Sequence, residues 1–290
     1  RRVLPEMPLV TTCHSTDLRQ FMQCRNLRTR VLSHCRGIDR ILSLSRDQTK
    51  QIADLYGIDE NRIDIVGGGF SAELFRRAEK PVPPPVQLLY AGKLSYSKGV
   101  DLLLDCCRRL NRLPIHLHLA GSGTGEEEAR CLELANKLGA DVTVHGRLAQ
   151  YQIARLMGTC HLFILPSFFE GLPLVLLEAL SSGCRVITTD LPGSQELLAQ
   201  ADANLVEFIR LPSMERIDRP SAGDMERLRS DLAGAIENMV ERILQEPIVP
   251  GAEIDRLIRT STWDSVFARI EKTYRRAIKE KSNKPRAKSV

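Results

Sequence analysis

Short apolar runs alternate with longer polar segments along most of this 290-residue chain. In the second half, strand-like runs occupy residues 86–91, 114–120, 141–146, 160–166, 184–189 and 203–208. A polar loop at 209–223 and a long helix at about 224–246 follow them. The first half contains three similar runs, PLVTTC, RILSLS and RIDIV. Strands that alternate with helical segments predict a parallel, doubly wound α/β sheet. Because the runs are apolar almost throughout, we expect helices to cover both faces of the sheet.

A proline-rich segment, EKPVPPP at residues 79–85, is predicted to link two domains. Residues 1–78 contain the three strands of the first half, with helices expected at 17–35 and 46–56. Three strands are few for a domain of this class, so we expect this domain to be partial, with further residues before Arg1. Residues 86–262 are predicted to form a C-terminal Rossmann-like domain. Residues 263–280 are predicted to form a helix that crosses back to the first domain, and residues 281–290 a disordered basic tail.

The net charge of +5 is concentrated at the C-terminus. Residues 272–290 contain eight Lys or Arg and one Glu, which leaves a net charge of −2 on the remaining residues. Since the body of the chain is not basic and aromatic residues make up only 5%, we do not expect nucleic-acid binding. A polybasic tail is attracted to anionic membranes, so we expect either a peripheral membrane contact or simply a solvated end.

The eight cysteines are scattered, without a C-x-x-C pair or zinc-ligand spacing. Several stand in apolar runs, which is typical of small buried side chains in a reducing cytosol. We therefore expect a cytoplasmic protein. No apolar stretch approaches the ~20 residues needed to span a bilayer.

The stretch FFEGLPLVLLEALSSGCRVITTD contains two carboxylates eight positions apart, Glu170 and Glu178. Pro173 suits the first turn of a helix and Gly183 the position just past its end, so a helix is predicted at about 173–182. This helix follows a strand, and ligands of open α/β sheets bind where strands end. Glu178 has apolar neighbours on every side, so it is unlike an ordinary solvated helix residue. A sugar is a suitable ligand for it, because sugar hydroxyls can donate hydrogen bonds to a carboxylate.

A second candidate site follows the first strand of the second half, in GKLSYSKGVDLLLDC. Lys93 and Lys98 stand on either side of a small polar loop, and Gly99 allows a helix to begin close to a ligand. Taken alone, such a loop is more often a surface turn than a phosphate site.

Glycines and a histidine mark other strand ends. His14 ends the first strand, with Ser15, Thr16 or Asp17 as candidate helix caps. The triplet at 67–69 follows the third strand, and AGSGTGEEE at 120–128 contains a G-x-G-x-G pattern. The three glutamates would repel a pyrophosphate, so helix-dipole stabilisation explains them better. His116 and His118 share a strand face, but without a third ligand we expect core histidines rather than a metal site.

The glutamate stretch resembles the E-x7-E signature of the retaining glycosyltransferases of family 4, in its form EGLPLVLLEA. The resemblance covers roughly residues 10–280. It implies the GT-B fold, in which two Rossmann-like domains face a cleft. It also implies that Glu170 approaches the sugar of the donor and that Glu178 binds its ribose. The turn between them would line the donor site through Gly171, Leu174 and Val175.

Other elements of the same family are recognisable. GKLSYSKG resembles G-R-L-x-x-x-K-G, whose two cations hold the diphosphate, with Lys93 in place of the arginine and Gly92 beside it. TTCHSTD resembles T-x-H-G-x-D, which implies that His14 reaches the donor. The resemblance implies further donor-site positions. Gly68 stands where relatives carry Pro-Asn-Gly, and Gly121 and Gly123 would line the crevice with their backbone. In HGRLAQ, the backbone near Arg147 and Leu148 would read the nucleobase. Trp263 resembles the start of the family's last helix.

The resemblance therefore implies a retaining transferase that moves a hexose-type sugar from a nucleotide-sugar to an acceptor. The donor is expected to be UDP-, GDP- or ADP-linked, and the acceptor is a glycan, a lipid or a small molecule. No D-x-D motif is present, so we expect no metal and no other cofactor, with Lys93 and Lys98 stabilising the leaving diphosphate. Two alternatives stay open: a non-catalytic nucleotide-sugar-binding or partner subunit, and a GT-B nucleotide-sugar epimerase.

Overall fold

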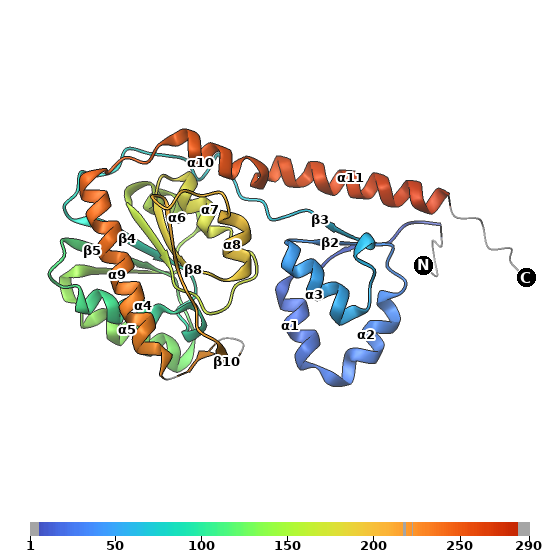
Figure 1. Cartoon of the computed structure of the whole chain (residues 1–290), viewed down its shortest axis with the longest axis horizontal. Helices are drawn as coiled ribbons and strands as arrows, with labels where there is room; N and C mark the ends of the chain where they lie inside the picture. The colour runs from blue at the N-terminus through green and yellow to red at the C-terminus, as the bar shows by residue number, and fades with distance from the viewer. Residues whose placement is uncertain (1–5, 217–218, 222, 284–290) are drawn as a thin grey trace, which may run out of the picture. The chain divides into compact units, whose positions relative to one another are not determined.

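The computed structural model describes residues 6–216, 219–221 and 223–283. It divides into two compact units. The smaller unit combines residues 1–69 with 260–290, and the larger unit consists of residues 70–259 (Figure 1). The first boundary therefore precedes the proline-rich segment, and residues 70–78 pack with the larger unit. Within the described part of the chain, no helix is both long and apolar enough to cross a bilayer.

The larger unit is built on a six-stranded parallel sheet in the order β6-β5-β4-β7-β8-β9. The strands are β4 (Val86–Ala91), β5 (Ile115–Ala120), β6 (Val142–Gly146), β7 (Leu162–Leu165), β8 (Arg185–Thr189) and β9 (Val206–Ile209). The chain adds strands outward from β4 as far as β6, and then returns to β7 on the other side of β4. The order thus reverses between β4 and β7, which is the position where doubly wound sheets bind ligands.

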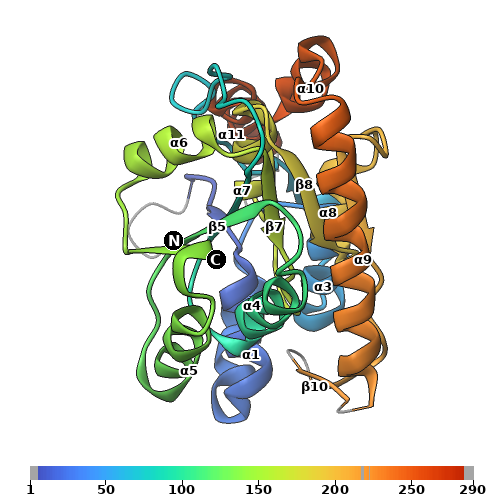
Figure 2. The ribbon, with the colours of Figure 1, turned by 90° about the vertical axis from the view of Figure 1, so that its left-hand side faces the viewer.

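Helices cover both faces of this sheet, as the continuous apolar strands predict. They are α4 (Val100–Arg109), α5 (Gly125–Asn136), α6 (Gln150–Thr159), α7 (Val175–Ser181), α8 (Pro192–Leu198), α9 (Asp224–Gln245) and α10 (Gly251–Ile258). α4 packs beside both α5 and α9, and α9 runs along the side of the unit (Figure 2). The side chains of Leu88, Phe163 and Ile187, one from each central strand, are fully buried between the layers.

Two features of this region were not expected from the sequence. The segment predicted as a loop at 209–223 contains a short antiparallel pair, β10 (Met214–Arg216) with β11 (Arg219–Pro220). Helix α10 follows Pro250 and packs against α7. Its apolar residues Ile254, Leu257 and Ile258 have helical spacing, but they extend over only about one turn.

The smaller unit has a three-stranded parallel sheet in the order β1-β2-β3. Its elements are β1 (Val10–Thr12), α1 (Ser15–Gln23), α2 (Arg28–Cys35), β2 (Arg40–Ser43), α3 (Arg46–Tyr56), β3 (Ile63–Ile65) and α11 (Trp263–Ser282). The helix expected at 17–35 is divided, with a 3-10 turn at Arg25–Leu27 between α1 and α2. The side chain of Arg28 donates to the carbonyl oxygens of Phe21 and Met22, so it replaces backbone hydrogen bonds at the end of α1.

Ion pairs fasten α11 to this sheet. The guanidinium of Arg40, buried on β2, contacts Asp64 of β3 at 2.6 Å and Glu280 of α11 at 2.8 Å. Arg269 of α11 donates to the carbonyl oxygen of Val66 at 2.7 Å. The C-terminal helix thus belongs to the same unit as β1–β3, while most of the basic tail expected at 281–290 lies outside the described residues.

Candidate functional site

The loops that follow β4 and β7 meet where the strand order reverses. The backbone N–H of Phe168 donates to the carbonyl oxygen of Ser97 at 2.9 Å. Gly99 has a φ of +65°, and a Cβ atom there would lie 2.0 Å from the carbonyl oxygen of Pro166. A glycine is therefore required at position 99 for the two loops to approach this closely.

This approach brings Lys98 and Glu170 into contact. Lys98 Nζ lies 2.7 Å from Glu170 Oε1, and their side chains are only 25% and 15% exposed. Lys98 Nζ also donates to the carbonyl oxygen of Phe169 at 3.2 Å. The pair places one cation and one carboxylate side by side at the carboxyl edge of the sheet.

A serine hydroxyl holds the same carboxylate oxygen from the other side. Ser167 Oγ donates to Glu170 Oε1 at 2.8 Å, and the Ser167 side chain is fully buried. The carbonyl oxygen of Ser167 in turn accepts a hydrogen bond from Thr189 Oγ1 of β8 at 2.6 Å. Strand β8 therefore fixes the residue that orients Glu170.

The loop after β4 also runs beside the loop after β5. The N–H of Leu94 donates to the carbonyl oxygen of Ser122 at 3.0 Å, and Leu94 pairs with Gly123 as an isolated parallel bridge. A Cβ atom on Gly121 would lie 1.8 Å from the carbonyl oxygen of Gly92. The predicted site glycines 92, 121 and 123 are thus brought together, with Lys93 exposed in the same loop.

The acidic run after these glycines has a local role. Glu128 Oε1 accepts a hydrogen bond from the N–H of Gly123 at 3.0 Å. Glu126, Glu127 and Glu128 occupy the first turn of α5, where negative charge is favourable. The N–H of Gly123 is therefore already paired with a side chain of the protein.

Glu178 is half-buried within α7. Burial raises the pKa of Glu178, and a hydrogen bond from the side chain of Gln150 opposes this rise. Gln150 is the first residue of α6 and follows the loop that contains Arg147 and Leu148. The loop after β6 and helix α7 therefore meet at Glu178.

Between the two glutamates, the chain forms a turn before α7 begins. The helix starts at Val175, with Leu174 at its N-cap, two residues later than the predicted start. Gly171 is held close to α8, because a Cβ atom on Gly193 would lie 1.8 Å from its carbonyl oxygen. The loop that carries Glu170 is thus packed against the start of α8.

The two other predicted site residues belong to the smaller unit. His14 is exposed at the carboxyl end of β1 and is itself the N-cap of α1, where the sequence suggested Ser15, Thr16 or Asp17. Its N–H donates to Asp17 Oδ2 at 2.7 Å, so Asp17 stabilises the helix start from inside the first turn. Gly68 follows β3, between Gly67 and Gly69 in the triplet.

A row of histidines crosses β5 and β6 of the larger unit. His118 Nδ1 lies 3.0 Å from His145 Nε2, and His118 Nε2 lies 2.9 Å from Gln87 Oε1. Burial and the neighbouring imidazoles lower the pKa of His118 to about 4. Among the described residues, no group of three or more His, Cys, Asp or Glu side chains is arranged to hold a metal ion.

Residues 71–209, which contain both loops and α7, match the family described as glycosyl transferases group 1. The match covers just under half of the chain. The matched domain includes Lys98, Glu170 and Glu178, and it ends with β9 of the larger unit.

Curated relatives match beyond this domain. The chain is 25% identical over 262 residues to a D-inositol 3-phosphate glycosyltransferase of Rhodococcus erythropolis, covering 84% of this chain and 55% of that protein. It is 27% identical over 201 residues to a glycogen synthase of Mycobacterium tuberculosis, covering 66% and 48%. The chain thus spans about half the length of these curated relatives.

Solved structures show the same fold. The Anabaena protein HepE, crystallised in complex with UDP, aligns with a TM-score of 0.72 at 18% identity, covering 93% of this chain and 72% of HepE. A sucrose-phosphate synthase of Thermosynechococcus elongatus aligns with a TM-score of 0.70 at 17% identity, covering 93% and 68%. The fold of the chain is therefore the Rossmann-like α/β fold of GT-B glycosyltransferases.

Proposed function

We propose that this protein is a glycosyltransferase that binds a nucleotide-sugar at the edge where β4 and β7 meet. The observation that carries the proposal is the contact between Lys98 and Glu170, 2.7 Å apart at the strand-order reversal of a glycosyl transferases group 1 domain. One group suits an anionic leaving group and the other suits a sugar. UDP-sugars are the first donors to test, because HepE was crystallised with UDP, and GDP- and ADP-sugars follow.

In the proposed reaction, the bond between the anomeric carbon and the diphosphate oxygen breaks, and the acceptor oxygen forms a new bond to that carbon. Negative charge develops on the diphosphate and positive charge on the sugar. Lys98, with Lys93 from the same loop, would stabilise the diphosphate. Glu170 would face the sugar, where its charge favours an oxocarbenium-like centre. We propose that the configuration at the anomeric carbon is retained.

Glu178 would have a different task in this scheme. Its carboxylate, half-buried beside Gln150, would accept hydrogen bonds from the ribose hydroxyls. The ribose does not change during transfer, so Glu178 contributes binding rather than catalysis. Arg147 and Leu148, in the loop before Gln150, would lie at the nucleobase.

We also propose that transfer is independent of metal ions. Lysine ammonium groups would neutralise the diphosphate directly, so no carboxylate cluster for magnesium is needed. Transfer that EDTA abolishes and magnesium restores would contradict this part of the proposal.

Donor binding tests the proposal directly. We expect a UDP-, GDP- or ADP-sugar to raise the unfolding temperature, because a ligand at 100 times its Kd stabilises the native state by about 2.7 kcal/mol. Lys98→Met should abolish this shift. Lys137→Met should not, since Lys137 lies on the surface of the same unit and pairs with Glu133 at 2.7 Å. A shift that is equal in both variants would place the donor elsewhere.

Product analysis then separates a transferase from the alternatives. Release of free sugar or its transfer to a glycan or lipid acceptor, with the anomeric configuration retained, is expected of the full-length protein. Donor binding without turnover would instead indicate a non-catalytic subunit. Recovery of an isomeric nucleotide-sugar would indicate an epimerase.

A further inference from the structure

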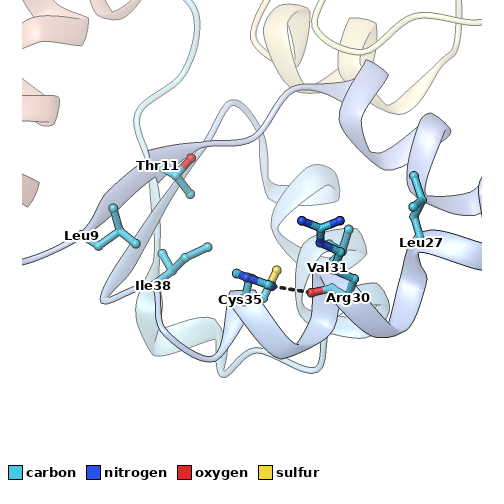
Figure 3. Close-up of a pocket in the computed structure, with 8 residues that line it drawn as sticks. Leu9, Thr11, Leu27, Arg30, Val31, Cys35 and Ile38 are labelled. Atoms are coloured by element: carbon cyan, nitrogen blue, oxygen red, sulfur yellow. Dashed lines mark hydrogen bonds between the residues drawn. The ribbon is translucent and has the colours of Figure 1, made fainter. Parts of the chain in front are cut away.

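The larger unit carries polar side chains on one face of its sheet, next to the loop that follows β6. His116 and His118 of β5 lie on the same face as Gln87, because Gln87 pairs with His116 in register. Thr143 of β6 pairs with His118 and extends this face. The pocket of the smaller unit between β1 and α2 is lined mainly by apolar side chains instead (Figure 3). Strands of sheets that helices cover are normally apolar, so the polar face is a departure from the pattern.

The histidine row ends at an extra residue in β6. Leu119 pairs with Val144, but the next pair is Ala120 with Gly146, so β6 advances two residues where β5 advances one. His145 is the additional residue. Bulges are rare between parallel strands and are frequent next to functional sites, where they redirect the chain. Gly146 follows with a φ of +63°, a conformation that favours glycine, and β6 ends there.

Hydrogen bonds that reach two neighbouring strands hold the side chain of His145. Its Nε2 lies 3.0 Å from His118 Nδ1, and His118 Nε2 lies 2.9 Å from Gln87 Oε1. Gln87 Nε2 donates to the carbonyl oxygen of Pro85 at 3.2 Å, so its amide oxygen faces His118. Burial lowers the pKa of both His118 and His145, so each imidazole carries a single N–H at pH 7. His118 therefore donates to Gln87 from Nε2 and accepts at Nδ1 from His145.

The loop after β6 is held at both of its ends. The N–H of Gly121 donates to the carbonyl oxygen of Gly146 at 2.8 Å. At the other end, the N–H of Ala149 donates to Gln152 Oε1 of α6 at 2.9 Å. Between these ends, Leu148 packs against the core of the larger unit. The position of the loop therefore depends on where the bulge places Gly146.

We infer that His145, held by His118, positions the loop after β6 so that its backbone discriminates one nucleobase from the others. The inference rests on the proposed function, since it concerns the base of the donor. One extra residue in a strand turns the residues that follow it towards the opposite face. The bulge thus decides which backbone groups of Arg147 and Leu148 would face the base. His145 acts through this loop and is a positioning residue.

Hydrogen-bonded recognition makes such positioning matter for specificity. A site built to bond one pattern of donors and acceptors rejects a ligand with another pattern, because its own buried polar groups are left unpaired. Misplacing the loop should therefore weaken the preferred base and leave the binding of other bases nearly unchanged. A purely structural role of the histidines would instead weaken all nucleotides by the same factor.

Titration with UDP, GDP and ADP tests the inference, because these nucleotides share the ribose and the diphosphate and differ in the base. The wild type is expected to prefer one of them by about tenfold or more. His145→Ala should lower this preference about tenfold, as expected for the loss of one hydrogen bond to the base. His118→Leu should do the same, because it removes the partner of His145. The ratio of two Kd values does not depend on the fraction of folded protein, so a poorly folding variant still gives an answer.

Two further variants serve as controls. The amide of His118→Gln can keep a hydrogen bond to His145, so this variant should retain the preference. His116 bonds to Thr143 Oγ1 at 2.8 Å and not to the bulged residue, so His116→Ala should also retain it. With the preferred nucleotide-sugar, His145→Ala and His118→Leu should raise the donor KM and leave kcat nearly unchanged, since the base does not change during transfer.

Other results would overturn the inference. Equal weakening of all three nucleotides by His145→Ala would reduce the row to a structural role. An equal loss of preference in His116→Ala would assign the effect to the sheet face rather than to the bulge. A wild type that binds the three nucleotides equally reads no base. If nucleotide binding depends on Lys98 but His145→Ala discriminates normally, only the inference fails, whereas a wild type that binds no nucleotide contradicts the proposed function as well.

Discussion

Lys98 and Glu170 form an ion pair, Nζ to Oε1 at 2.7 Å, between the loops that follow two neighbouring parallel strands. Both side chains are largely shielded from water, so their attraction is stronger than that of a surface pair. In the proposed complex, the diphosphate brings two further negative charges to Lys98. We therefore expect the donor to draw Lys98 away from Glu170 and to leave the carboxylate facing the sugar.

Replacing Glu170 by Gln should chiefly lower kcat. The amide keeps the shape of the side chain and can still accept from Ser167, but it removes the charge that would face the developing cation. Loss of one preorganised electrostatic group typically lowers kcat by about 10²-fold or more. Steady-state kinetics with a saturating donor measure the effect. An unchanged kcat with a raised donor KM would reduce Glu170 to a binding group.

Replacing Glu178 by Ala should chiefly raise the donor KM. The ribose is bound equally in the ground state and the transition state, so losing its partner removes uniform binding and leaves kcat nearly unchanged. Comparing the two glutamate variants on the same donor separates the two roles. If neither variant alters either constant, the proposed donor site would be incorrect.

Glu178 should also make the ligand-free protein less stable at neutral pH. Burial raises the pKa of Glu178 above its usual value of 4.5, so between these two pKa values the folded state binds more protons than the unfolded state. Stability contributed by this group is therefore present at low pH and lost as the pH rises through the folded pKa. We expect Glu178→Gln to raise the unfolding temperature at pH 7 and to weaken donor binding. Glu237→Gln, at an exposed position of α9, is the control and should change neither.

Ser167 is expected to act through Glu170 rather than on the substrate. Ser167→Ala removes the hydrogen bond to Glu170 Oε1, and we expect kcat to fall about tenfold with a smaller change in KM. Losing a buried hydrogen bond also costs about 1 kcal/mol of stability. Ser181→Ala is the matched control, because Ser181 is also buried but bonds to the carbonyl oxygen of Phe75. A parallel loss of kcat in the control would attribute the effect to stability alone.

The sequence predicts the larger unit well because its signals are local. Most strands are short, largely apolar runs, and Gly183 follows the end of α7 with a φ of +80° at the position that the pattern indicated. Lys98 and Glu170 were identified for the same reason, since both follow strand ends. Their contact is not local, because it depends on β4 and β7 being neighbours, and 72 positions separate the two residues.

Residues that act through a neighbour were not found from the sequence. Ser167 follows a strand and stands three residues before Glu170, so its place was a usable signal, but its hydrogen bond was not evident. Gln150 has no such signal, because its contact with Glu178 depends on how α6 and α7 pack. The break between α1 and α2 was also missed, although the Arg28 side chain that accompanies it bonds to carbonyl oxygens only six and seven residues earlier.

The histidine row on β5 and β6 should make stability depend on pH in the acid range. The pKa of His118 falls from 6.5 to about 4, because burial and the imidazoles of His116 and His145 disfavour its charged form. Below pH 6.5 the unfolded state therefore binds a proton that the folded state does not. Stability contributed by this group is complete above pH 6.5 and is lost as the pH falls towards 4.

Denaturant unfolding at pH 7.5 and pH 5 measures this loss. We expect the wild type to lose on the order of 2 kcal/mol more between these pH values than His118→Gln, whose amide can keep a hydrogen bond to Gln87 or His145 without binding a proton. His34→Gln, at an exposed position of α2, should lose as much as the wild type. If His118→Gln and the wild type lose equal stability, the row is already solvated enough for His118 to titrate normally in the folded state.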